Sequence, residues 1–259
     1  MKKPVSILVT WDVDPAQEVC TENMKRALEQ TRCLLRDYKI PSTFFVPANM
    51  AEQFRGDIIN FIPDGHEIGC HGLTHGNEED YNRMPEDIQR KYLYEATDIL
   101  RKSTGQTVHS FRGPHMKTSA VTQKILSGLG YIADCSVASQ RVDFVSSNLI
   151  NVSWIFAPRL PYRPSRRSAF RKGDQDICVV PPLGGNSAIH FKCSLHTEGK
   201  SNERPVQNSL YGVTTYRKAY SVPCTSLRIC ALYGSLETGR IIYYPKNPHA
   251  WVSFQRATL

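Results

Sequence analysis

The sequence predicts an α/β fold, namely a (β/α) barrel with about seven parallel strands and room for irregular units. Strand signals and helix signals alternate along the chain, and no linker or internal repeat divides its 259 residues. Strands that alternate with helices pair in parallel, because each helical crossover returns the chain to the same end of the sheet. We therefore expect a single domain over residues 1–259.

The first half of the chain carries the clearest signals. Residues 6–11 are apolar and typical of a buried strand, and the apolar residues of 21–38 recur at helical spacing. Gly105 and Gly130 are suited to end two further helices. The other elements expected here are strands at 42–46, 66–70, 110–112 and 131–133, a helix with Pro85 in its first turn that runs to about residue 103, and a helix capped by Thr118 that runs to residue 129.

The second half gives weaker signals. We expect strands at 151–156, 177–180 and 240–244 and a helix at 225–237. Residues 183–231 do not show the periodicity of regular barrel units.

Composition excludes some classes of protein. No apolar run approaches the roughly 18 residues of a membrane span. The apolar stretch after Lys2 and Lys3 is too short for a signal peptide, so we expect a cytoplasmic protein. The eight cysteines include no C-x-x-C pair, which favours reduced core residues over a zinc ribbon.

The positive charge is unevenly distributed. Residues 1–150 carry 17 basic and 19 acidic residues, whereas residues 151–259 carry 15 basic and 5 acidic ones. This excess could attract an anionic glycan, a phosphate or a membrane surface. A solvated face explains it more simply, and the sequence contains no nucleic-acid-binding module, so we expect no nucleic-acid partner.

Polar side chains with unusual chemistry fall where strands should end. Asp12 and Asp14 follow the first strand, and His71 and His75 follow a later one. We expect a helical turn to place both imidazoles on one side. In a (β/α) barrel such groups meet at the C-terminal ends of the strands, and two histidines with one carboxylate can bind a hydrolytic metal ion. Each motif alone is weak, since H-x-x-x-H pairs arise by chance and Asp-x-Asp often forms turns.

Two more segments add to this set. Arg112 stands at a strand end, where its charge can keep a neighbouring carboxylate ionised, and Asp134 follows the strand-like residues 131–133. We expect His66 to be structural or to support the metal ligands.

Residues 5–16, 65–79 and 110–118 together resemble the successive motifs of the NodB-homology polysaccharide deacetylases, carbohydrate esterase family 4. They are most similar to the branch that contains intracellular peptidoglycan deacetylase-like proteins and imide or ureide hydrolases. The resemblance extends over about residues 4–181, is poor over 183–231 and returns faintly at 232–249. It implies a distorted (β/α) barrel of seven strands and a divalent metal ion, zinc first, with cobalt or nickel as alternatives.

The resemblance also implies a role for each matching residue. Asp12 matches the general base, Arg112 the arginine that keeps this base ionised, and the backbone N–H of His115 the oxyanion donor. Asp134 matches the carboxylate that tunes the catalytic histidine, although the local pattern differs. The metal ligands are matched by Asp14, His71 and His75.

The family's final motif is altered in this chain. The histidine that protonates the leaving amine aligns with Asn247, and an amide cannot supply a proton at neutral pH. His249, two residues on, can titrate in the required range and is our candidate for the general acid. A surface position for His249 is the alternative.

Three functions remain open from the sequence. The chain could remove N-acetyl groups from amino sugars or polysaccharide, could open a small imide or ureide, or could be an inactive metal- or sugar-binding relative. The expected partner is thus a carbohydrate or small amide substrate, and the sequence leaves a homo-oligomer open.

Overall fold

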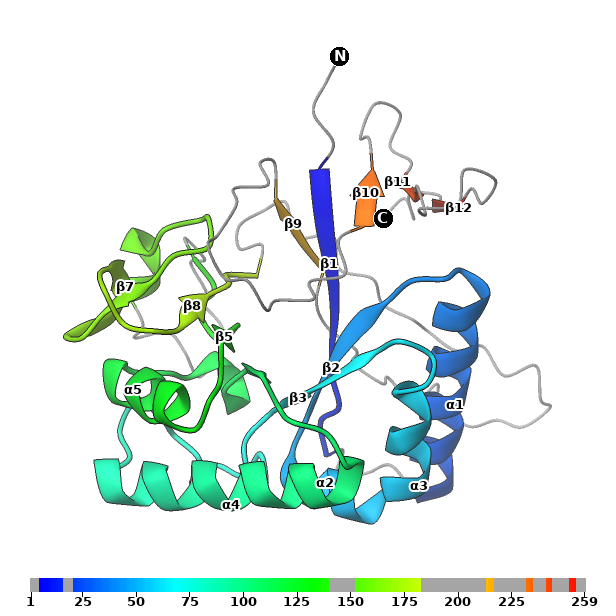
Figure 1. Cartoon of the computed structure of the whole chain (residues 1–259), viewed down its shortest axis with the longest axis horizontal. Helices are drawn as coiled ribbons and strands as arrows, with labels where there is room; N and C mark the ends of the chain where they lie inside the picture. The colour runs from blue at the N-terminus through cyan, green and yellow to red at the C-terminus, as the bar shows by residue number, and fades with distance from the viewer. Residues whose placement is uncertain are drawn as a thin grey trace, which may run out of the picture.

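The computed structural model describes residues 5–15, 21–139 and 152–182 and four short strands nearer the C-terminus (Figure 1). Its centre is a curled sheet in which six strands lie side by side, each parallel to the next. The predicted parallel α/β architecture is therefore confirmed. These six strands are, in spatial order, β1 (Val5–Asp12), β2 (Ser42–Val46), β3 (Glu67–Cys70), β4 (Ser110–Phe111), β5 (Ala133–Asp134) and β8 (Cys178–Val179).

Helices connect the first five strands and flank the sheet (Figure 1). The α-helices are α1 (Thr21–Asp37), α2 (Ala48–Gln53), α3 (Arg55–Ile58), α4 (Glu86–Thr104) and α5 (Ala120–Gly128). Three short 3₁₀ helices are η1 (Ile59–Phe61), η2 (Pro114–Met116) and η3 (Val152–Phe156). The order of strands and helices follows the prediction closely up to β5.

Antiparallel strands join the sheet at the β1 edge. Both β9 (Val213–Tyr216) and β10 (Leu232–Gly234) pair with β1 in antiparallel orientation. Away from the main sheet, β6 (Pro164–Ser165) pairs with β7 (Ser168–Lys172), and β11 (Ile241–Tyr243) pairs with β12 (Val252–Phe254). A strand was expected at 240–244, and the structure places one there, although its described partner is β12 and not the parallel sheet.

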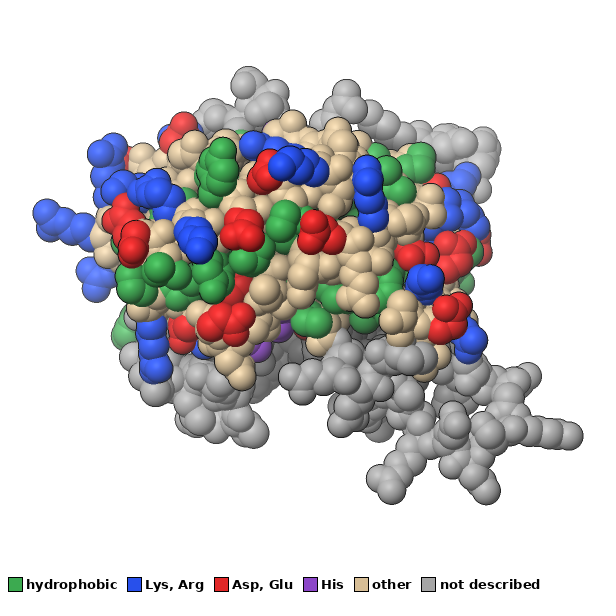
Figure 2. Space-filling model, turned by 90° about the horizontal axis from the view of Figure 1, so that it is seen from below, with side chains coloured by type: hydrophobic (Ala, Val, Ile, Leu, Met, Phe, Trp, Pro, Cys, Tyr) green, Lys and Arg blue, Asp and Glu red, His purple; other side chains and the backbone are tan. Residues whose placement is uncertain are grey.

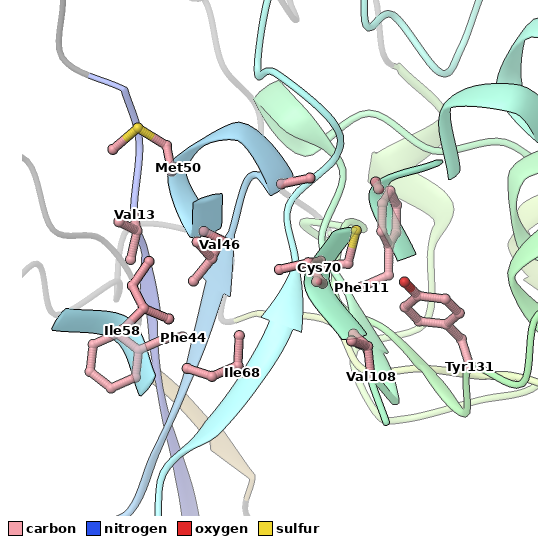
Figure 3. Close-up of a cluster of buried hydrophobic side chains, with 14 of the residues drawn as sticks. Val13, Phe44, Val46, Met50, Ile58, Ile68, Cys70, Val108, Phe111 and Tyr131 are labelled. Atoms are coloured by element: carbon pink, nitrogen blue, oxygen red, sulfur yellow. The ribbon is translucent and has the colours of Figure 1, made fainter. Parts of the chain in front are cut away.

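The central strands are buried on both faces, as expected for a parallel sheet between a helical layer and a barrel interior. Successive side chains of β2 alternate between these environments. Phe44 and Val46 belong to the large cluster that includes residues of the helices, whereas Phe45 packs with Ala133 and Val180. Figure 3 shows Phe44 and Val46 among the buried side chains of the first cluster. Complete burial of one such side chain contributes about 1.5–3 kcal/mol to folding.

Helix α4 shows how sequence pattern and capping agree. Its buried residues Leu93, Ala96 and Leu100 recur every three or four positions and face the sheet. Gly105 ends the helix in the left-handed conformation at φ 70°, as predicted, and its N–H donates to the Arg101 carbonyl. Pro85 is the N-cap residue rather than part of the first turn, so the helix begins at Glu86.

Three predicted elements were wrong in part. Residues 152–156 form a 3₁₀ helix, not a strand. The helix expected at 225–237 is contradicted at Leu232–Gly234, which form β10, and its other residues lie outside the described part of the chain. The cap of α5 is Ser119 rather than Thr118, because Ser119 and Thr122 form a reciprocal capping box while Thr118 donates to Asp134.

None of the described helices combines the length and the apolar composition needed to cross a membrane. Figure 2 shows basic and acidic side chains interspersed over the face that it presents, with apolar side chains between them. Cys70 and Cys135 are buried free thiols, as expected for core cysteines.

Candidate metal centre

The parallel sheet brings residues from distant segments to one edge. Asp12 is the last residue of β1, His71 directly follows β3 and Arg112 directly follows β4. Because these strands are parallel, their carboxyl ends lie at the same edge of the sheet. The backbone of His71 is fixed there by its N–H, which donates to Val46 on β2 at 3.0 Å.

Three of the predicted residues form a compact set of possible metal ligands. Asp14 Oδ1 lies 3.2 Å from His71 Nε2 and 3.3 Å from His75 Nε2. One oxygen or nitrogen atom from each residue lies within 4.8 Å of the others. With metal–ligand distances of about 2.1 Å, ligand atoms in tetrahedral geometry are about 3.4 Å apart. The observed separations therefore fit a single ion between the three side chains.

The tautomer of His71 follows from its second nitrogen. Nδ1 lies 2.6 Å from the main-chain carbonyl oxygen of Arg112, and a carbonyl can only accept, so Nδ1 carries the proton. When the ring is neutral, the lone pair of Nε2 therefore faces Asp14. A lone pair that faces a carboxylate oxygen at 3.2 Å requires a cation between them, either a proton or a metal ion.

The electrostatics of the set agree with this reading. Burial lowers the pKa of His71, but the negative charges of Asp12 and Asp14 outweigh this effect, and the pKa is raised. Burial likewise raises the pKa of Asp14, but His71, His75 and His115 outweigh it, and that pKa is lowered. The pKa of His75 is lowered by burial, and the charge of Asp14, which would raise it, does not outweigh that effect. The two carboxylates thus favour positive charge at His71, whereas His75 favours its neutral, metal-binding form.

The loop that joins the two histidines is not the expected helical turn. Gly72 has φ 81° and His75 has φ 62°, both in the left-handed region, so the chain coils back on itself between them. The rings of His71 and His75 still converge, with centroids 4.9 Å apart. The helical-turn prediction was wrong because H-x-x-x-H spacing fixes only how far apart the residues are in sequence.

Arg112 binds the candidate base directly. Its Nη1 donates to Asp12 Oδ1 at 2.6 Å and its Nη2 to Thr10 Oγ1 at 3.0 Å. The guanidinium also lies over the ring of Phe45, with Cζ 4.3 Å from the centroid. This pairing was predicted, and the structure places Asp12 beside the three candidate ligands without making it one of them.

His115 lies next to the ligand set. Its ring centroid is 4.6 Å from that of His75, and the residue adopts a left-handed conformation at φ 54° inside η2. Burial lowers the pKa of His115, and the neighbouring His75 lowers it further. The structure thus places the His115 ring beside His75, while the role predicted for its backbone N–H stays a prediction.

Asp134 lies in a buried hydrogen-bond network, and the histidine that it is predicted to tune, His249, lies outside the described residues. The carboxylate is fully buried and accepts hydrogen bonds from Thr118 Oγ1, Gln123 Nε2 and the main-chain and hydroxyl groups of Ser136. Ser136 Oγ in turn accepts from the N–H of Gly113. Among the described residues, the hydrogen-bond partners of Asp134 include no histidine, and they instead connect it to the segment that carries His115.

The two residues that precede the metal motif lie at the other end of β3. His66 Nδ1 accepts a hydrogen bond from the Ser42 N–H, and its ring packs edge-on against Phe44 and Phe61. Glu67 accepts from Thr43 Oγ1 and Ser110 Oγ. His66 is therefore structural, one of the two roles expected for it.

The sequence analysis missed one buried charged residue, Glu79. Its carboxylate is fully buried and contacts the loop between His71 and His75. Glu79 lies between Glu78 and Asp80 in an acidic run, and no sequence signal distinguishes its buried carboxylate from the two more exposed ones beside it. His249 and Asn247, the candidates of the final motif, lie outside the described residues.

Comparison with known proteins gives a consistent result. The profile of the family described as "Polysaccharide deacetylase" matches residues 2–133. A peptidoglycan deacetylase of Helicobacter pylori is 27% identical over 105 residues, which are 40% of this chain and 34% of that protein. YheN of Bacillus subtilis, proposed to be a polysaccharide deacetylase, is 26% identical over 96 residues, 37% of this chain and 33% of that protein.

Among solved structures, a protein from Mycobacterium smegmatis proposed to be a polysaccharide deacetylase aligns with a TM-score of 0.49 and 22% identity. The alignment covers 67% of this chain and 57% of that one. The matched segments span only about a third of the two curated relatives. The family profile, by contrast, covers just over half of this chain and contains Asp12, Asp14, His71, His75 and Arg112. The chain therefore belongs to the polysaccharide deacetylase family.

Proposed function

We propose that this protein is a metal-dependent hydrolase that removes N-acetyl groups from amino sugars in a polysaccharide. One observation carries the proposal: Asp12, paired with Arg112 at 2.6 Å, lies beside a separate set of ligands formed by Asp14, His71 and His75. A hydrolytic site needs this division between a group that accepts a proton and groups that hold a metal ion. Family membership supports the same reaction.

Asp14, His71 and His75 would hold the metal ion. Two imidazoles and one carboxylate leave coordination positions open for water and substrate, as catalytic sites require. When bound, a divalent ion supplies Lewis acidity, which makes water a nucleophile at neutral pH and polarises a carbonyl oxygen. We propose zinc, with cobalt and nickel as substitutes that suit the same ligands.

The chain's own residues perform the proton transfers. Asp12 accepts the proton of the attacking water, and the Arg112 guanidinium orients its carboxylate for this step. The backbone N–H of His115 is our candidate donor to the oxygen of the substrate amide, where negative charge develops. We assign protonation of the leaving amine to His249.

The substrate class comes from the relatives. The Helicobacter pylori relative is named a peptidoglycan deacetylase, and the polysaccharide deacetylase profile matches the segment of this chain that contains the candidate site. An acetylated amino sugar within a glycan is therefore the substrate that we propose.

A release assay tests the proposal. Purified protein is loaded with zinc, cobalt or nickel and incubated with acetylated amino-sugar monomers, acetylated glycan oligomers and cyclic ureides. Acetate and ammonia are quantified separately. We expect metal-dependent acetate release that is greatest with the oligomers and absent in Asp12→Asn. Ammonia or ring opening from ureides, without acetate from any glycan, would contradict the proposal.

A further inference from the structure

The loop between the two candidate histidine ligands is built around a buried carboxylate. Three consecutive backbone N–H groups, those of Leu73, Thr74 and His75, donate to the Glu79 carboxylate at 2.7, 2.8 and 2.6 Å. Successive N–H groups that point to one centre form a concave site for an anion. Here the anion is a side chain of the same protein, four to six residues further along the chain.

Two hydroxyl groups supply further donors, that of Thr74, which lies 3.4 Å from Glu79 Oε2, and that of Tyr81. The Tyr81 hydroxyl donates to Glu79 Oε1 at 3.0 Å. The Tyr81 ring is fully buried and packs edge-to-face against Phe111. Burial raises the pKa of Tyr81 well above its usual value, and the charge of Glu79 adds to this effect, so the hydroxyl keeps its proton. No lysine or arginine of the described residues forms an ion pair with Glu79, whose hydrogen bonds come from neutral donors.

The backbone of the loop requires this carboxylate. His75 is held at φ 62°, which costs a residue with a side chain about 1–3 kcal/mol. Charge-assisted hydrogen bonds are roughly twice as strong as neutral ones, and the His75 N–H donates the shortest of the three. The hydrogen bonds to Glu79 therefore offset the strain at the residue whose imidazole must point to Asp14.

Gly72 shows how closely the carboxylate approaches. A Cβ atom at this position would lie 2.9 and 3.0 Å from the two Glu79 oxygens and 2.8 Å from Pro114 Cγ. The carbonyls of Gly72 and Leu73 accept from the N–H groups of Ala48 and Asn49 in α2. The loop is thus fixed on one side by α2 and on the other by Glu79.

From these contacts we propose that Glu79 is a positioning residue for the metal site. It orders the segment from Leu73 to His75 and so holds the His75 imidazole at the distance from Asp14 that a metal ion requires. This inference rests on the proposed metal site, since it concerns the placement of one of its ligands. Glu79 acts on His75 through the backbone N–H, not as a metal ligand, and takes no part in proton transfer.

Metal affinity tests the inference independently of activity. Glu79→Gln keeps the size of the side chain but replaces one acceptor oxygen by an NH₂ group, which faces backbone donors and cannot accept from them. Loss of a group that orients a metal ligand typically weakens binding by about 10- to 100-fold. We expect a weakening of this size in the dissociation constant for zinc, measured by competition with a chromophoric chelator. The absorption bands of the cobalt-loaded protein should also change.

Two further variants complete the experiment. Thr97→Val removes buried hydrogen bonds to Leu93 and Tyr131, away from the loop, and should lower the unfolding temperature while the zinc dissociation constant stays within about twofold. Glu79→Asp keeps the charge but shortens the reach, and its zinc affinity should fall between those of wild type and Glu79→Gln. If Glu79→Gln does not fold, the zinc affinity of Glu79→Asp relative to wild type tests the positioning role.

The outcomes separate the two proposals. A wild-type protein that binds no divalent ion would contradict the metal site itself. A wild-type protein that binds zinc, with folded Glu79 variants that match its affinity and cobalt spectrum, would contradict only the positioning role. Equal losses of affinity in Thr97→Val and Glu79→Gln would also contradict it, because the effect would then follow stability alone.

Discussion

The side chain of His71 is hydrogen-bonded to the backbone of Arg112: Nδ1 of His71 donates to the carbonyl oxygen of Arg112 at 2.6 Å. The side chain of the same arginine holds Asp12 at 2.6 Å. One residue at the end of β4 therefore orients a candidate metal ligand with its backbone and the candidate base with its guanidinium. These two functions can be separated by mutation, because substitution removes the guanidinium and leaves the carbonyl.

Asp12→Asn should abolish turnover and leave metal binding unchanged. The amide keeps the size of the carboxylate but cannot accept the proton of the attacking water. Loss of general base catalysis lowers the rate by about 100- to 10,000-fold. Acetate release and metal content are measured on the same preparation. If Asp12→Asn loses its metal, Asp12 is a ligand, and the division of roles between the two aspartates is wrong.

Arg112→Ala should lower turnover less than Asp12→Asn and should keep the metal. The carboxylate base remains but is no longer held, while the carbonyl that orients His71 is still present. Removal of one partner of a buried ion pair also destabilises a protein by about 3–5 kcal/mol, so unfolding in urea is measured alongside. Arg112→Lys serves as the control, because lysine retains the positive charge but lacks the planar guanidinium with its several N–H donors. Loss of metal from a folded Arg112→Ala protein would show that the side chain, and not the carbonyl, maintains the ligand set.

The fold was predictable where local patterns and tertiary burial agree. The strand signal at 42–46 and the boundary signals Pro85 and Gly105 each predicted an element almost to the residue. Burial of the strand and the left-handed end of the helix at Gly105 agree with these local signals. The η3 segment was misread, since an apolar run such as Trp154–Phe156 has no periodicity that distinguishes a strand from a short helix.

The sequence predicts which residues form the candidate site but not the contacts that position them. Asp12, Asp14, His71, His75 and Arg112 could be selected because polar groups at the ends of apolar strands are costly unless used. The left-handed loop at His75 and the burial of Glu79 arise from contacts with α2, Tyr81 and Pro114, which no local pattern encodes.

The general acid is tested by a pair of variants. His249→Ala should lower turnover by about 100-fold or more with metal binding intact, because the leaving amine loses its proton source. Asn247→His is the complementary change, which restores the residue type that the family carries at that position. Increased activity in Asn247→His together with unchanged activity in His249→Ala would contradict the assignment.

Leu93→Ala tests the packing of α4 on the sheet. Leu93 is fully buried in the main core cluster, and truncation of such a leucine costs about 2–5 kcal/mol of unfolding free energy. Tyr94, its neighbour on the helix, is 66% exposed, so Tyr94→Ala should change stability by no more than about 0.5 kcal/mol. Urea titration measures both. Similar losses in the two variants would mean that α4 does not pack as described.

Metal content tests the central claim most directly. Wild-type protein and a variant with both His71→Ala and His75→Ala are stripped with chelator, reloaded with zinc, freed of excess metal and measured by elemental analysis. The separations of 3.2 and 3.3 Å between Asp14 and the two imidazoles predict about one ion per wild-type chain. The folded double variant should hold essentially none, because a single carboxylate is left to bind the ion. Full metal content in that variant would contradict the assignment of Asp14, His71 and His75 as the metal site.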